Sequence, residues 1–270
     1  MVTKMSDTIS NSNLKNVYWL ALIGAMCLTL FYYFQSYYTH LMTIFSNAFP
    51  LFIAAAAVIT SSLALRNYWV NLESKFSKIW LGFSLGMSFW FISELSWAIY
   101  TLILDIKTPY PSVADVYRLV GYGFLFFAIF TYIELFRPAI SKKIFATASI
   151  LVLPTSAGII PLLLLSISAK ASTMNLTTLL VDLAYPLLDL ALLALAMLGL
   201  LVFTITELKG KIGSVWLLIN AGIIMNVFGD MLFSYTNLQN TYYSGHPLEL
   251  FFHLGHLFLL LSFYTHTKKL

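Results

Sequence analysis

The chain has 270 residues, of which 60% are hydrophobic and only 10% are charged, and its mean hydropathy is +0.84. A soluble domain carries about 25% charged residues, so this composition excludes an ordinary soluble protein and indicates an integral membrane protein. The formal net charge is +4, but the basic residues lie in short segments between apolar runs, which is typical of membrane orientation rather than of nucleic-acid binding. The single cysteine, Cys27, excludes an intrachain disulfide.

The first 16 residues are polar and predict a cytoplasmic N-terminal tail. The apolar run that follows has no small-residue cleavage pattern after it, so we interpret it as a first membrane-spanning helix, with a removed signal peptide as the alternative. About 20 apolar residues cross a bilayer. On this basis the sequence predicts an all-α integral membrane protein with eight spans, at residues 17–35, 41–65, 78–104, 115–136, 144–167, 177–206, 213–236 and 247–267.

The basic residues are divided unevenly between the two sets of connecting segments. All but three of the 15 Lys and Arg residues lie on the side of the two termini, and only Lys107, Arg118 and Lys170 fall on the other side. Membrane proteins keep Lys and Arg on the cytoplasmic side. The sequence therefore predicts a multi-pass protein of the cell membrane with both termini in the cytoplasm.

An internal similarity indicates that the chain consists of two related halves. Shifts of 136 and 134 residues align matching residues, or residues of a comparable kind: Trp80 with Trp216, Gly86 with Gly222, Glu94 with Asp230, Asp115 with Glu249, and Gly121 with Gly255. These matches fall on Trp, Gly and acids, whereas a merely apolar composition would favour matches on leucine. We therefore expect a duplicated four-helix unit, with one half at residues 17–136 and the other at residues 144–267, and sites tend to form where such repeats meet.

Four of the acidic residues are predicted to lie properly within the membrane. They are Glu94, Asp182, Asp189 and Asp230. An ionisable side chain within a span costs about 2.5–3.5 kcal/mol on insertion scales, so it usually faces the interior of the bundle and serves a function. All four lie in the outer half of the predicted bundle, and the inner half contains almost no such group.

The starts of the fourth and eighth spans add further polar residues to this layer. Asp115 and Arg118 follow a proline-containing turn in which Ser112 is a predicted helix cap, and we expect Asp115 and Arg118 to pair with each other. In the eighth span, Glu249, His253 and His256 share one helix face, because they are spaced four and three residues apart. The complete predicted ligand-binding set is Glu94, Asp115, Arg118, Asp182, Asp189, Asp230, Glu249, His253 and His256.

Four interpretations of this layer remain open from the residues alone. Glu249, His253 and His256 could bind a divalent transition metal, because imidazole and carboxylate ligands suit Zn, Cu, Fe or Ni. The same groups, with aromatic residues such as Trp90 and Trp97, could line a pocket for an organic or lipid ligand. They could also relay protons, or form a structural polar network that fixes helix register.

A short element of the sequence resembles a known membrane module. Its residues are Pro109, Pro111, Ser112, Ala114, Asp115, Tyr117, Gly121 and Tyr122. They resemble the P-x-PS-x-AD-x-x-Y-L-x-GY element of a multi-span module found ahead of diguanylate cyclase and histidine kinase output domains in prokaryotes. The resemblance covers roughly residues 78–266 and implies a sensory input module. Because no output domain follows in this chain, a sensory role implies a separate signalling protein as partner.

A second, shorter resemblance points to a different class of protein. Gly229, Asp230, Leu232, Gly245, Phe252 and His256 are similar to the GD-x-L … G … F … H pattern of the eight-span lysoplasmalogenase family. That family implies hydrolysis of ether lipids within the membrane, and Asp230 and His256 would then be its acid–base pair.

These observations favour a membrane receptor or sensor-like protein that binds a small ligand or metal ion in an outward-facing polar pocket. An intramembrane lipid hydrolase is the alternative. A transporter is a third class, but it needs polar groups on both sides of the midplane. The expected partners are membrane lipids, the small ligand or metal ion and a signalling protein, without nucleic acid.

Overall fold

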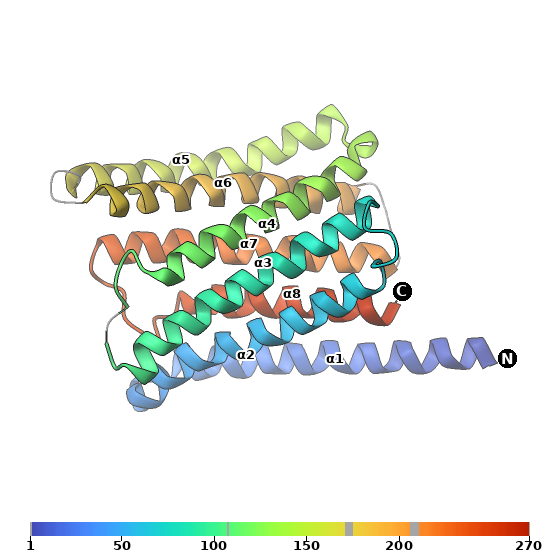
Figure 1. Ribbon diagram of the computed structural model, residues 1–270, viewed down its shortest axis with the longest axis horizontal. Helices are drawn as coiled ribbons and strands as arrows, with labels where there is room; N and C mark the ends of the chain where they lie inside the picture. The colour runs from blue at the N-terminus through green and yellow to red at the C-terminus, as the bar shows by residue number, and fades with distance from the viewer. Residues whose placement is uncertain (1, 107, 171–174, 206–210, 270) are drawn as a thin grey trace.

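The computed structural model describes residues 2–106, 108–170, 175–205 and 211–269 (Figure 1). Within these ranges the chain is helical and contains no β-strand. The long helices are α1 (Val2–Tyr33), α2 (Thr39–Arg66), α3 (Lys75–Ala98), α4 (Val113–Leu135), α5 (Lys142–Lys170), α6 (Leu176–Ile205), α7 (Lys211–Leu238) and α8 (Glu249–Lys269). Five of them, α1, α2, α4, α6 and α7, contain segments long and apolar enough to cross a membrane. The expected all-helical class is confirmed, and these five helices support a membrane protein.

Each predicted span coincides with one of these helices, although several ends differ. Residues 2–16, predicted as a separate tail, belong to α1. This helix has 32 residues and is therefore about 48 Å long, whereas the hydrocarbon core of a bilayer is about 30 Å thick. Its N-terminal part accordingly extends past the other helices (Figure 1). Lys107 and the predicted end of span six at residue 206 lie outside the described residues.

Six helices form a closed ring in the order α2, α3, α4, α6, α7 and α8, since each of them packs against the next and α8 packs against α2. Helix α1 lies outside the ring against α8, and α5 lies outside it against α6. The two chain ends lie at the same end of the molecule (Figure 1). The α3–α4 and α7–α8 connections lie at the opposite end.

Large aromatic side chains fill the ring at the end where the termini lie. Trp80 and Trp216 are buried, with ring centroids 6.4 Å apart. Tyr132 stacks on Trp216 at 3.3 Å, and Phe263 meets Trp80 edge-on at 5.7 Å. Close-packed aromatic rings of this kind leave no room for a ligand. The hollow part of the ring is therefore at the other end.

Glycine pairs bring neighbouring helices close together beside the ring's centre. A Cβ atom on Gly121 of α4 would lie 3.1 Å from the carbonyl oxygen of Gly86 in α3. In the same way, Cβ atoms on Gly222 of α7 and Gly255 of α8 would each lie 2.9 Å from the other residue's carbonyl oxygen. Only residues without a side chain permit such backbone approach. These contacts hold α3 close to α4 and α7 close to α8.

Candidate ligand-binding site

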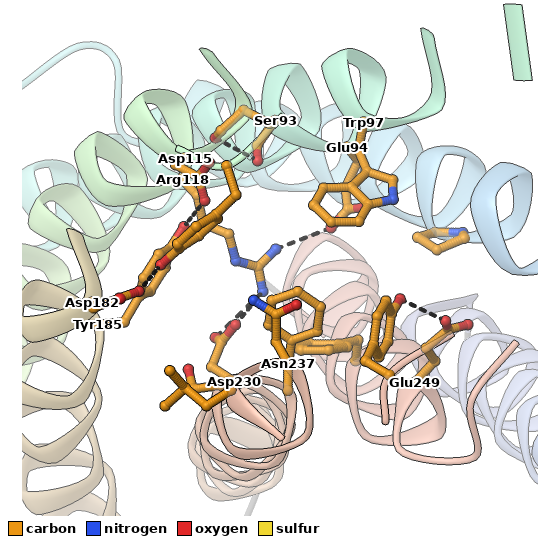
Figure 2. A pocket seen from close by; sticks show the side chains of 18 of the residues that line it. Ser93, Glu94, Trp97, Asp115, Arg118, Asp182, Tyr185, Asp230, Asn237 and Glu249 are labelled. Atoms are coloured by element: carbon orange, nitrogen blue, oxygen red, sulfur yellow. Dashed lines mark hydrogen bonds and ion pairs between the residues drawn. The ribbon is translucent and has the colours of Figure 1, made fainter. Parts of the chain in front are cut away.

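A pocket of about 110 Å³ opens at the end of the ring opposite the termini. Residues from α2, α3, α4, α5, α6, α7 and α8 line it, together with residues of the α3–α4 and α7–α8 connections. Polar side chains from several of these helices point into the same space (Figure 2). The ring of helices therefore brings residues that are up to about 200 positions apart in the chain to the wall of one cavity.

Arg118 of α4 lies in the middle of this pocket (Figure 2). Its Nη1 donates to Glu94 Oε1 at 3.0 Å, and its Nη2 donates to Asp230 Oδ1 at 3.2 Å. The guanidinium carbon also lies 5.0 Å from the Trp90 ring centre and 5.2 Å from that of Phe252. Two carboxylates and two aromatic faces thus hold the arginine, whose side chain is only 11% exposed.

The expected pairing of Arg118 with Asp115 is wrong, because Asp115 is engaged in starting α4. One of its oxygens accepts the Ser112 backbone N–H at 2.7 Å and the Ser112 hydroxyl at 3.0 Å, which forms the capping box at this helix start. The Tyr185 hydroxyl donates to its other oxygen at 3.0 Å. The predicted cap Ser112 is confirmed. All the donors to Asp115 are neutral groups, and Asp115 lines the pocket wall.

Glu249 opens α8 and is held in a similar way. Its Oε1 accepts the Tyr242 hydroxyl at 2.8 Å and the Gly245 backbone N–H at 2.9 Å, and its Oε2 accepts the Tyr32 hydroxyl at 2.8 Å. Gly245 has a φ of +91°, a left-handed conformation that glycine adopts without strain. Burial and the charge of Glu249 raise the pKa of Tyr242 well above its usual range, so Tyr242 remains a neutral donor.

His253 is connected to Glu249 through the hydroxyl group of Tyr32. Its Nε2 lies 2.6 Å from the Tyr32 hydroxyl oxygen. Tyr32 has one hydroxyl proton and donates it to Glu249, so the Nε2–H of His253 donates to the tyrosine oxygen. Nδ1 of this neutral imidazole is then an acceptor, and no residue of the described chain donates to it. His253 is 1% exposed and lines the pocket.

Asp182 of α6 closes the wall near the mouth of the pocket. The Tyr110 hydroxyl, from the α3–α4 connection, donates to its Oδ1 (Figure 2). Burial, together with this hydrogen bond, raises the pKa of Tyr110, which therefore stays protonated. The contact ties the segment before α4 to α6 across the opening.

Asp189 and His256 lie behind the pocket and do not line it. The Tyr122 hydroxyl contacts Asp189 at 2.5 Å and also contacts Asp230. The Tyr122 hydroxyl therefore links these two carboxyl groups, and Asp230 also binds Arg118. His256 hydrogen-bonds through Nδ1 with the carbonyl of Phe252 at 2.8 Å.

The structure thus brings seven of the nine predicted residues to one pocket. These are Glu94, Asp115, Arg118, Asp182, Asp230, Glu249 and His253. Sequence reasoning missed the tyrosines that hold the acids, namely Tyr32, Tyr110 and Tyr242. The chain has 16 tyrosines, and in an apolar sequence each is typical of core or of the membrane interface. No pattern in the sequence distinguishes these three.

The geometry gives no support to the predicted metal site. In the part of the chain that the structure describes, no group of three or more His, Cys, Asp or Glu side chains is placed to hold a metal ion. Glu249 and His253 are joined through the Tyr32 hydroxyl, and His256 lies beside the ring of Trp90 at 5.6 Å.

The predicted hydrolase pair is not in contact either. Asp230 bonds to Arg118 and Tyr122, and the Nε2 of His256 has no hydrogen-bond partner among the described residues. Acid–base catalysis by this pair needs both groups to reach the bound substrate, and of the two only Asp230 lines the pocket.

Comparisons with protein-family models, with curated proteins and with solved structures give no match for this chain. The function therefore has to be argued from the pocket itself.

Proposed function

We propose that the protein is a multi-pass membrane receptor, or sensor-like protein, that binds a small ligand in this pocket. The observation that carries the proposal is the convergence of Glu94, Arg118 and Asp230, from three different helices, on one cavity. A buried ion pair rarely adds more stability than well-packed apolar residues would. A charged cluster that also faces a cavity is therefore better explained by ligand binding than by folding.

We propose further that all eight helices cross the cell membrane, with both termini in the cytoplasm and the pocket facing outward. The two termini lie at one end of the bundle and the pocket at the other. Helices α3 and α8 are less apolar because they bury polar side chains such as Ser93 and His253 inside the ring. In intact cells, an impermeant thiol reagent should label Thr241→Cys but not Ser141→Cys in a Cys27→Ser background; the reverse pattern would invert the topology.

The resemblance to sensory input modules supports a role in signalling. On this proposal, ligand occupancy at the outer end changes how α3, α4, α7 and α8 pack, and a separate protein detects the change on the cytoplasmic side. The glycine contacts Gly86–Gly121 and Gly222–Gly255 support the further proposal that the chain consists of two copies of a four-helix unit, because both pairs align in the predicted duplication.

The ligand proposal is tested with a variant that fills the pocket. Ser234 is half-buried and lines the pocket, whereas Thr177 is exposed and does not. Both carry a hydroxyl, so Thr177→Trp is a matched control for Ser234→Trp. The melting temperature of the full chain in detergent micelles is measured with a library of small anions, cations and neutral compounds.

We expect at least one class of compound to stabilise the wild type and Thr177→Trp, but not Ser234→Trp. The proposal fails if no class stabilises the wild type. It also fails if the stabilisation persists in Ser234→Trp, because the compound would then bind elsewhere.

A further inference from the structure

The residues that line the pocket carry an excess of acidic groups. Five carboxyl groups face one guanidinium, with the carboxyl groups on Glu94, Asp115, Asp182, Asp230 and Glu249. Arg118 pairs with two of them. Asp115 and Glu249 receive hydrogen bonds only from neutral donors and form no ion pair in the described chain. By formal charge, the lining therefore favours a cation over an anion.

Aromatic faces lie next to Glu249, which forms no ion pair among the described residues. Phe233 packs edge-on against Trp97 at 6.1 Å and against Tyr242 at 4.7 Å, and all three rings line the pocket. Trp97 is fixed in place because its indole N–H donates to Asn47 Oδ1 at 3.1 Å. Aromatic faces bind organic cations through the charge distribution of the ring while also covering an apolar body.

A free acceptor points to the kind of cation. His253 Nδ1 has no donor among the described residues, although the side chain is 1% exposed and, like Glu249, lines the pocket. A buried acceptor without a partner costs about 1–3 kcal/mol. A ligand with N–H donors removes that cost, whereas a quaternary ammonium ion, which has no N–H, does not.

The size of the pocket limits the ligand. A volume of about 110 Å³ is below the range of about 300–1,000 Å³ that is typical of pockets for drug-sized ligands. The occupant is therefore a small molecule.

We infer that the pocket takes a small organic cation, a primary ammonium group on a short apolar body. The ammonium N–H groups face Glu249 and His253 Nδ1, and the body lies against Trp97, Phe233 and Tyr242. This inference rests on the proposed function, since it names the ligand class of the same pocket.

The charge class is tested with probes that share one carbon skeleton. The melting temperature of the full chain in detergent micelles is measured with 2-phenylethylammonium, 2-phenylethanol and phenylacetate at millimolar concentrations. A second set, n-butylammonium, 1-butanol and butyrate, has the same charges on a smaller body. We expect only the ammonium members to raise the melting temperature, with a dependence on concentration that gives Kd.

Two variants and a control locate the binding. Glu249→Gln should raise the Kd of 2-phenylethylammonium by about tenfold or more, which corresponds to losing one charge-assisted hydrogen bond. Phe233→Leu should raise it several-fold, because the leucine keeps the apolar contact and loses the aromatic face. Asp105→Asn should leave it unchanged: Asp105 is exposed outside the pocket, and its φ of +50° suits asparagine.

The outcomes separate this inference from the proposed function. Three results would contradict the inference of an organic cation as ligand. They are stabilisation by phenylacetate or butyrate, equal stabilisation by all members of a set, and stabilisation by Zn²⁺ alone. Failure of both ammonium probes while another compound binds in a manner sensitive to Ser234→Trp would contradict it as well. In each of these cases the receptor pocket stands if the stabilisation is lost in Ser234→Trp, and it fails if the stabilisation persists there. If no compound of any charge binds, both proposals fall.

Discussion

The helix pairs α3–α4 and α7–α8 cross on glycines in the same manner. Gly86 faces Gly121 in the first pair, and Gly222 faces Gly255 in the second. The residue that covers the glycine of the second helix differs: it is Trp90 in one pair and Asn226 in the other. Small residues thus hold both backbones at close approach, while the side chains around them are free to differ.

The larger difference lies at the pocket. In each pair the first helix carries an acid in its second half, Glu94 in α3 and Asp230 in α7. Both acids bind Arg118 of α4. The residue of α8 that lies 134 positions after Arg118 is Phe252, and its ring packs on the guanidinium at 5.2 Å. One pair supplies the cation and the other covers it. A duplicated frame would produce this single asymmetric site, although the duplication itself remains a prediction.

Removing the shared cation should have the largest effect. In Arg118→Met, Glu94 and Asp230 are left as buried acids without their partner, and we expect unfolding to be easier by about 3–5 kcal/mol. Lys75→Met is the control, because Lys75 pairs with Glu134 at 3.6 Å with both side chains about half exposed, a contact worth about 0–1 kcal/mol. Equal losses of unfolding free energy in detergent micelles would contradict a buried ion pair at the pocket.

Substitutions at the two crossings should have a smaller effect and should be similar to each other. In Gly121→Ala the new Cβ would lie 2.4 Å from Trp90 Cδ1, and in Gly255→Ala it would lie 2.2 Å from Asn226 Nδ2. We expect each to lower the free energy of unfolding by about 1–3 kcal/mol through overpacking. Gly123→Ala meets nothing within 4 Å and should be neutral or stabilising by up to about 1 kcal/mol. A loss confined to one crossing would show that the two pairs are not equivalent.

The sequence indicated the helices and the inward-facing acids, because long apolar runs and the cost of burying charge are local properties. It could not identify the partners of Arg118. Asp115 lies three residues away and is the obvious choice on a helix, but its carboxyl group accepts the Ser112 backbone N–H at the start of α4. The true partners, Glu94 and Asp230, lie 24 and 112 positions away. Only the closed ring of helices brings them to the arginine.

The smallest expected effect distinguishes the two outer connections by pH. Ser112 precedes α4, and the residue 134 positions later is His246, whose Nδ1 accepts the Leu248 backbone N–H at 3.2 Å before α8. Burial lowers the pKa of His246, so the folded protein favours the neutral imidazole. Its contribution is therefore present above the ordinary pKa of about 6.5 and is lost as pH falls from there toward the lower pKa of the folded state.

His246→Ser copies the arrangement at α4 and should remove this dependence. The difference in unfolding free energy between wild type and His246→Ser should shrink by about 1 kcal/mol or less, the net contribution of one hydrogen bond, between pH 7.5 and pH 5. His40→Ser, at an exposed position of α2, is the control and should show no such change. A difference that grows as pH falls would mean that His246 is stabilised in its charged form.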